Sequence, residues 1–331
     1  MNAPALLADI GGTHARFALR FPGRSMPAEL AVLRCSEHAS LFDAICSYLA
    51  HHTRVAPRSC AIGIATPVLG DWVSMTNRPW SFSIHELQAA LTLDRLIVIN
   101  DFTALALALP LLRPHELHGV GHGQGRPGAP LAVLGPGTGL GVSALIPHRD
   151  GLVPVAGEGG HVTLSAASEA EEAVIAKLRL RFGHASAERA LSGPGLVNLY
   201  LACCEIAGRT PKALEPAQVS ALALRDEDPM CRRAVEMFFA LLGSTAGNLA
   251  LTLGALGGVY IGGGIVPQLL ALIEPSLFRA RFEGKGRYAA YLREVPTWVI
   301  TSEFPPALLG VARALEIADS SPSPASGRGP E

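Results

Sequence analysis

A carboxylate stands directly before a glycine turn near the start of the chain. Asp9 and Ile10 end an apolar run, and Gly11, Gly12 and Thr13 then form the first glycine turn. Exposed backbone N–H groups of such a turn can hold phosphate oxygens, while the carboxylate holds a hydrated Mg²⁺ ion. The same pattern also occurs as an ordinary hairpin turn, so both interpretations stay open on this segment alone.

Two further glycine clusters are denser. The second glycine turn (residues 135–141) has four glycines in seven positions, which costs backbone entropy that a simple hairpin does not need. Close approach of the backbone to a ligand explains that cost. The third glycine turn (residues 262–264) lies between a strand pattern and a helical segment, where the backbone could lie flat against an adenine or a ribose. A close strand-to-helix packing turn is the alternative for this third cluster.

Five polar side chains have the chemistry to hold a sugar. Asn100 and Asp101 end a buried strand pattern, Glu158 and His161 lie in the glycine-rich segment GEGGH, and Glu188 precedes a helical pattern. Carboxylates and imidazoles can bond several adjacent hydroxyl groups at once. Taken singly, Glu188 is a common helix-start residue and His161 a common structural histidine. Together the five predict a sugar pocket.

The elements that position these residues alternate between strands and helices. The first glycine turn joins strand patterns over residues 6–10 and 15–19, which excludes the strand-to-helix fingerprint of dinucleotide-binding proteins. A helix is predicted over residues 40–51, and buried strands over residues 60–68 and 96–101. The last of these strands ends on the Asn–Asp pair, and functional residues recur at strand ends in α/β folds.

A connection rich in glycine and proline, residues 113–130, is predicted to separate two domains. Residues 131–147 then repeat the strand, turn and strand pattern of the N-terminus. Helices are predicted over residues 168–181 and 228–253. Two glycine turns facing one another across a cleft could hold a nucleotide between them.

The composition indicates a globular protein with small-molecule ligands. Of 331 residues, 49% are apolar and 17% charged, and the formal charge is −1, so nothing favours a nucleic-acid partner or a membrane surface. The N-terminus lacks the features of a signal peptide, which predicts that the protein is not exported. Six scattered cysteines without a C-x-x-C pair predict reduced, buried thiols and no structural zinc site.

The motifs together resemble those of bacterial glucokinases, which belong to the hexokinase-like branch of the actin-like ATPase superfamily. The resemblance covers about residues 6–310 and is carried by the segments LADIGGTHARFAL, INDFTALALALP, GPGTGLGV, GEGGHVTL, SAERALSGPGLVNLY and GALGGVYIGGGIVPQLL. It implies a two-domain α/β fold, the actin-like ATPase (ribonuclease H-like) fold, with a cleft between a small and a large domain.

The resemblance also implies domain boundaries, ligands and an assembly. The small domain would span residues 1–112 and be rejoined by residues 301–318, the large domain would span residues 113–300, and residues 319–331 would form a disordered tail. The ligands would be glucose, ATP and Mg²⁺, with no nucleic acid and no membrane as partners. The protein would be a cytoplasmic homodimer.

Roles carried over by position fall into two sets. The implied glucose ligands are Asn100, Asp101, Glu158, His161 and Glu188, and Asp101 is the implied catalytic base. The implied ATP-binding residues are Asp9, Ile10, Gly11, Gly12, Thr13, Gly137, Thr138, Gly139, Gly262, Gly263 and Gly264, and Asp9 would hold Mg²⁺ through water.

Two departures from the family pattern concern the nucleotide. The family usually has Asn where this chain has His14, and a small residue where it has Pro136. Both lie at glycine turns, so they bear on nucleotide affinity and phosphate-donor preference. Three alternatives to a glucose-specific kinase remain from the sequence: a broader hexose kinase that accepts mannose or glucosamine, a sugar-sensing regulator, and an actin-like ATPase. A regulator would normally carry an added DNA-binding helix-turn-helix, and an ATPase would not need the polar cluster.

Overall fold

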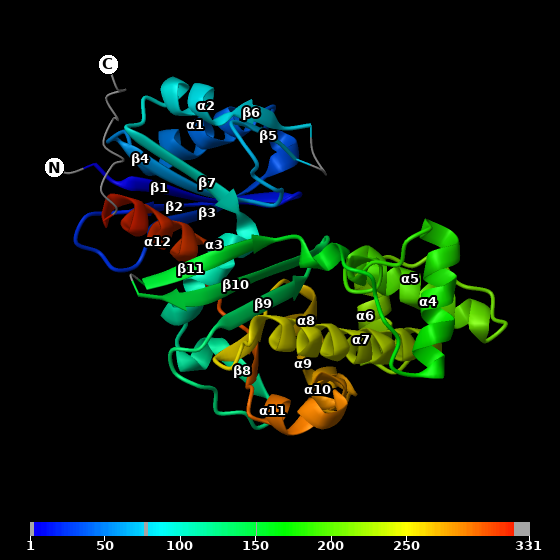
Figure 1. Ribbon diagram of the computed structural model, residues 1–331. Coiled ribbons are helices and arrows are strands. Elements are labelled where there is room, and N and C mark those ends of the chain that lie inside the picture. Colours follow the sequence, from blue (N-terminus) through cyan, green and yellow to red (C-terminus); the bar gives the residue numbers. More distant parts are fainter. Residues whose placement is uncertain (1–2, 76–78, 150, 321–331) are drawn as a thin grey trace, which may run out of the picture. The chain divides into compact units, whose positions relative to one another are not determined.

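The computed structural model describes residues 3–75, 79–149 and 151–320, and it divides the chain into two compact units. Unit 1 comprises Met1–Leu111 and Phe304–Glu331, and unit 2 comprises Leu112–Glu303. The chain therefore leaves unit 1 once, completes unit 2 as a continuous segment, and returns (Figure 1).

Unit 1 is built on a five-stranded sheet. Its strands lie in the order β3 (Ala28–Arg34), β2 (His14–Arg20), β1 (Ala5–Ile10), β4 (Ser59–Ile64) and β7 (Arg95–Asn100). Strands β1, β4 and β7 are parallel, and β2 and β3 run antiparallel to their neighbours. The other elements are α1 (Leu41–His52), α2 (Ile84–Ala90), α3 (Asp101–Ala108), α12 (Pro306–Ser320), the 3₁₀ helices η1 (Cys35–Glu37) and η2 (Leu109–Leu111), and the hairpin of β5 (Trp72–Ser74) and β6 (Ser81–Ser83).

Apolar side chains cover both faces of this sheet, which explains why β1 is an almost unbroken apolar run. Leu6 belongs to the core on one face, whereas Leu7 packs with Val311 of α12 on the other. Helix α12 also lies directly on α3, as Figure 1 shows. The two helices approach so closely that a Cβ on Gly310 would lie 1.7 Å from the carbonyl oxygen of Ala104.

Unit 2 is built on a six-stranded sheet. Its strands lie in the order β11 (Gly151–Gly157), β10 (Leu140–His148), β9 (Leu131–Pro136), β12 (Gly258–Ile261), β13 (Thr297–Ile300) and β8 (Leu117–Val120). The predicted connection over residues 113–130 is wrong in one respect, because it contains β8, which pairs antiparallel with β13. Glycine and proline are frequent in this segment, but four of its residues, one of them Gly119, still extend and pair.

Helices surround this sheet. They are α4 (Glu169–Phe182), α5 (Gly193–Ile206), α6 (Pro216–Leu224), α7 (Pro229–Leu253), α8 (Ile265–Gln268), α9 (Leu270–Ile273), α10 (Phe278–Glu283) and α11 (Ala289–Arg293), with 3₁₀ turns η3 (Pro114–Glu116), η4 (Gly159–His161), η5 (Ala187–Arg189) and η6 (Gly286–Tyr288). The predicted helices over 168–181 and 228–253 correspond to α4 and α7. Ser168 and Asp228 cap them through side-chain oxygens that accept backbone N–H bonds, as expected for these residue types.

Helix α7 is the central helix of unit 2. By length and composition it could cross a membrane, but 72% of its most apolar window is buried within the protein. Two glycines let α10 pack against it: a Cβ on Gly243 would lie 2.1 Å from the carbonyl oxygen of Phe278, and one on Gly247 would lie 2.4 Å from that of Phe282. The helix is therefore accounted for as a core element.

Two smaller sequence expectations need correction. Cys46 lies exposed on α1, whereas the other five cysteines are buried, and none of the six forms a disulfide. The final helix continues past residue 318, and Asp319 forms an ion pair with Arg95. Residues 321–331, the rest of the expected tail, lie outside the described residues.

Candidate active site

Asp101 is the first residue of α3, at the carboxyl end of β7. Asn100 caps this helix, because its Oδ1 accepts the backbone N–H groups of Phe102 (2.9 Å) and Thr103 (3.1 Å). The Nδ2 group of Asn100 donates to Oδ1 of Asp101 at 2.9 Å, and the Phe102 N–H donates to the same oxygen at 2.9 Å. The hydrogen bonds from Asn100 and Phe102 thus both end on Oδ1 and hold that oxygen in place.

The surroundings of Asp101 make its carboxylate a stronger base than usual. Burial, and then the negative charge of Asp9, raise the pKa of Asp101 to about 6, although the hydrogen bonds from Phe102 and Asn100 act in the opposite direction. The two carboxylates come from the ends of strands in one sheet: Asp9 of β1 pairs in register with Gly63 of β4, and the next residue of β4 pairs with Asn100. A base whose pKa lies near the working pH is suited to proton abstraction.

Asp9 is itself held by a neighbouring strand. Its Oδ2 accepts a hydrogen bond from Nη1 of Arg16 at 3.1 Å, directly across the β1–β2 pair. Burial raises the pKa of Asp9, and the Arg16 charge opposes that rise. Among the described residues no group of three or more His, Cys, Asp or Glu side chains could hold a metal ion by itself.

The first glycine turn closes the β1–β2 hairpin. The N–H of Gly11 donates to the carbonyl of His14 at 3.0 Å, and the carbonyl of Thr13 accepts from the N–H of Cys35 at 3.0 Å. The side chain of Ile10 is fully buried in the core, so only its backbone can face a ligand. Thr13 is exposed at the tip of the turn.

The second glycine turn closes the corresponding hairpin of unit 2, between β9 and β10. The N–H of Gly137 donates to the carbonyl of Gly139 at 2.8 Å, and Thr138 is exposed between them. Glu188 contacts this turn: its Oε2 accepts the backbone N–H of Leu140 at 2.9 Å. One predicted sugar ligand therefore lies against a predicted phosphate turn.

The segment with Glu158 and His161 lies beside the same hairpin. Both side chains are exposed, and neither forms a hydrogen bond to another described residue. Gly160 packs so closely on the end of the turn that a Cβ there would lie 2.0 Å from the carbonyl oxygen of Leu140. The following residues pair with the segment of Glu188, since the Ala187 N–H donates to the Val162 carbonyl at 2.9 Å. Within unit 2 the structure therefore brings together the three predicted sugar ligands.

The third glycine turn, between β12 and α8, packs on the second. Gly263 has φ = 76°, and a Cβ there would lie 2.2 Å from the carbonyl oxygen of Pro136. The Gly262 N–H donates to the Leu134 carbonyl at 2.9 Å, whereas Gly264 is exposed with open space at its Cα. The close backbone approach at Gly263 therefore serves the packing of one turn on the other, which was the alternative for this cluster, and contact with an adenine or ribose stays a prediction.

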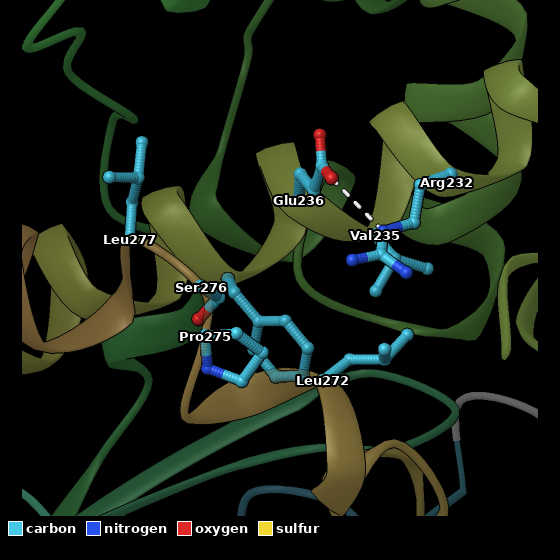
Figure 2. A pocket seen from close by; sticks show the side chains of 8 residues that line it. Arg232, Val235, Glu236, Leu272, Pro275, Ser276 and Leu277 are labelled. Carbon is cyan, nitrogen blue, oxygen red and sulfur yellow. Dashed lines mark hydrogen bonds and ion pairs between the residues drawn. The ribbon is translucent and has the colours of Figure 1, made fainter.

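The small hollow in Figure 2 is a different feature of unit 2. Apolar side chains that include Val235, Phe239 and Leu272 line it, and an ion pair between Arg232 and Glu236 (3.0 Å) lies at its side. None of the predicted site residues lines it.

Comparison with known proteins identifies the family. The glucokinase family model matches residues 6–318. A glucokinase of Aromatoleum aromaticum is 53% identical over 316 residues, which cover 95% of this chain and 95% of that protein. This chain belongs to the glucokinase family.

Solved structures agree with the expected fold. The crystal structure of a glucokinase from an Antarctic psychrotroph superposes with a TM-score of 0.85 at 36% identity, covering 96% of this chain and 100% of that one. A glucokinase of the ROK family from Streptomyces griseus, in complex with glucose and AMPPNP, superposes with a TM-score of 0.63 at 18% identity, covering 94% and 99%. The two-domain actin-like ATPase fold and the resemblance to glucokinases are both confirmed.

Two contacts of this glucokinase-family site were missed from the sequence. Arg16 was not singled out, although it carries a charge opposite to that of Asp9 and lies at the mirrored position of a hairpin whose turn was predicted. Counting outward from the turn along both strands could have identified Asp9 and Arg16 as cross-strand partners. The contact between Glu188 and Leu140 had no such signal, because 48 residues separate them.

Proposed function

We propose that this protein catalyses the ATP-dependent phosphorylation of D-glucose at its 6-hydroxyl group, which gives glucose 6-phosphate, the first step of glycolysis. Membership of the glucokinase family supports this, and the decisive observation is Asp101, a partly buried carboxylate at a strand end with a pKa raised to about 6. The co-substrates are glucose and ATP.

Asp101 is the proposed catalytic base. A carboxylate oxygen of Asp101 takes the proton of the 6-hydroxyl group of glucose, a contribution of ~10²–10⁴ in rate. The hydroxyl oxygen bonds to the γ-phosphorus while the bond from that phosphorus to the β–γ bridging oxygen of ATP breaks, and ADP leaves. Asn100 orients the Asp101 carboxylate by donating to its Oδ1, and it also caps α3. One side chain therefore holds both the start of the helix and the base. Glu158, His161 and Glu188 bind the remaining sugar hydroxyls in this proposal.

The three glycine turns are the proposed phosphate and nucleotide cradle. Backbone N–H groups at such turns stabilise the charge that spreads over the transferring phosphoryl group. Asp9 suits a hydrated Mg²⁺ ion, which binds through one or two carboxylates together with substrate phosphates. When bound, Mg²⁺ would neutralise phosphate charge. Asp9 would hold it through water with the oxygen that does not face Arg16.

Assembly and location complete the proposal. A homodimer in the cytoplasm follows from the family resemblance. Size-exclusion chromatography with light scattering tests the dimer, and a mass near 34.6 kDa would show a monomer instead.

The range of sugars is the main alternative within kinases. Hydroxyl discrimination depends on small displacements of groups such as Glu158 and His161, so a broader hexose kinase would share the same residues. A coupled assay of the purified protein with ATP across glucose, mannose, glucosamine and fructose separates the two. Equal kcat/KM for glucose and mannose would favour the broader enzyme, and no turnover of any hexose would refute the kinase proposal.

The raised pKa predicts an acid limb in the rate. Because only the ionised carboxylate can accept a proton, we expect kcat/KM for glucose to fall about tenfold per pH unit below about 6, and to be independent of this group above about 7. Initial rates at saturating ATP between pH 4.5 and 8.5 measure this. If kcat/KM stays constant from pH 7 down to pH 5, as expected for a carboxyl group with the ordinary pKa of 3.8, the assigned environment of Asp101 would be contradicted.

Glucose is expected to compact the protein. The proposed ligands come from both units, Asn100 and Asp101 from unit 1 and the others from unit 2. Binding one sugar by both should therefore draw them together. Small-angle scattering with saturating glucose should give a smaller radius of gyration, whereas mannitol at the same concentration serves as the control. An unchanged radius with glucose bound would count against shared binding.

A further inference from the structure

We propose that Glu188 is a positioning residue that couples sugar binding to nucleotide binding inside unit 2. This inference rests on the proposed function, which assigns Glu188 to the sugar and the second glycine turn to the nucleotide. It adds a role that neither assignment contains: the same carboxylate holds the turn in shape. One side chain therefore contacts both the sugar and the turn that would bind the phosphates.

The contacts converge on a single residue of the turn, Leu140. Its N–H donates to Oε2 of Glu188 at 2.9 Å. Its carbonyl oxygen lies against Gly160, next to the predicted sugar ligand His161, at a distance that leaves no room for a Cβ. The N–H of Leu140 thus faces the proposed sugar ligand Glu188, and its carbonyl faces the segment that carries His161.

The backbone of Glu188 is also held, by a hydrogen bond from the start of α5. The hydroxyl of Ser192 donates to the Glu188 carbonyl at 2.8 Å and also caps α5, accepting the N–H of Gly195 at 3.0 Å. The first residue of the same helix, Gly193, donates its N–H to the carbonyl of Gly137 at 2.8 Å. Two hydrogen bonds therefore join the segment of Glu188 to the turn, one through the side chain and one through the start of α5.

Space around the carboxylate is also restricted. A Cβ on Gly139 would lie 2.4 Å from Oε2 of Glu188. A side chain at position 139 would therefore displace the carboxylate from its place beside the turn. The carboxylate cannot shift by an ångström toward a sugar hydroxyl without either breaking its bond to Leu140 or moving the turn with it.

A reciprocal effect follows from this geometry. A sugar that orders the free oxygen, Oε1, reduces the motion of Oε2 and hence of the turn that would contact phosphate. By linkage, a nucleotide that orders the turn must increase sugar affinity by the same factor. The effect requires no movement of the two units.

Two substitutions at one position separate the roles of Glu188. Glu188→Gln keeps a carbonyl oxygen that can accept the Leu140 N–H but loses the charge, whereas Glu188→Ala loses both. We expect both variants to bind glucose at least about 10-fold more weakly, since a hydrogen bond to a charged group is lost. Only Glu188→Ala should bind AMPPNP more weakly without sugar, by about 5- to 10-fold.

Calorimetry with AMPPNP, with and without glucose, measures the affinities. Hydrogen exchange at residues 139–141 measures the turn itself and needs no ligand. The Leu140 amide should be protected in the parent and in Glu188→Gln, and should exchange at least about 10-fold faster in Glu188→Ala. Glu294→Ala, at an exposed glutamate of the same unit, is the matched control and should leave exchange and both affinities unchanged.

Failure of this proposal and failure of the proposed function are distinguishable. If the parent phosphorylates glucose but Glu188→Ala keeps parental AMPPNP affinity and exchange, the positioning role is wrong and the kinase assignment stands. If Glu188→Ala and Glu188→Gln lose AMPPNP affinity equally, charge rather than the bond to Leu140 matters, and the proposal is also overturned. A parent without hexose kinase activity would refute the function itself, whatever the exchange shows.

Discussion

Asp101→Asn should lower kcat by ~10²-fold or more while glucose affinity changes far less. Asparagine keeps the shape of the side chain, and its oxygen can still accept the bonds from Asn100 and Phe102 that hold Oδ1. It cannot accept a proton at neutral pH. Steady-state rates give kcat, and calorimetry or tryptophan fluorescence gives the dissociation constant for glucose. The acid limb near pH 6 should vanish in the residual activity.

The stability of this variant distinguishes a base from a structural carboxylate. Because the pKa of Asp101 is raised in the folded protein, its contribution to stability is fully present below pH 3.8 and is lost as the pH rises through about 6. At pH 8, Asp101→Asn should therefore unfold no more easily than the parent. Its free energy of unfolding should be higher by ~1–3 kcal/mol, because the substitution removes a charge that desolvation disfavours. A variant that folds like the parent and turns over glucose at undiminished kcat would refute the base assignment.

Gly263→Ala should weaken nucleotide binding and destabilise unit 2. The residue has φ = 76°, and the added methyl group would meet the carbonyl oxygen of Pro136 at 2.2 Å, so the second and third glycine turns must separate. We expect the free energy of unfolding to fall by ~2–5 kcal/mol, from left-handed backbone strain together with overpacking. AMPPNP affinity should fall at least ~10-fold, since two turns of the proposed cradle move by an ångström or more.

Gly128→Ala is the matched control for this substitution. Gly128 belongs to the same unit and has φ = 73°, but no atom lies within 4 Å of an added Cβ. It should lose only the ~1–2 kcal/mol of backbone strain and keep parental AMPPNP affinity. Chemical denaturation and calorimetry on both variants measure the difference. Equal losses in the two variants would show that the contact with Pro136 has no role.

Local patterns in the sequence predicted the elements that carry the proposed site. The hairpins around the first two glycine turns follow from apolar strand patterns interrupted by glycine. The helix predicted over residues 228–253 matches α7, which Asp228 caps. These features depend on neighbours within a few residues. The same reasoning placed Asp101 at a strand end before any contact was known.

What the sequence could not predict depends on segments that are far apart along the chain. The pairing of β8 with β13 joins residues about 180 positions apart, and the bond between Glu188 and Leu140 spans 48. Neither has a local period or a turn to indicate it. The raised pKa of Asp101 is of the same kind, since it requires knowing that β1, which ends at Asp9, and β7, which precedes Asp101, both pair with β4 in one parallel sheet.

The return of the chain to unit 1 has a consequence for the order in which the protein can fold during synthesis. Residues 1–111 leave the ribosome first, yet one face of their sheet, with Leu7 and Ala61, is covered by α12, which is made after the whole of unit 2. Unit 2 is continuous and can complete its core earlier. A nascent chain that stalls before residue 304 therefore carries an uncovered apolar sheet, the kind of surface that chaperones bind.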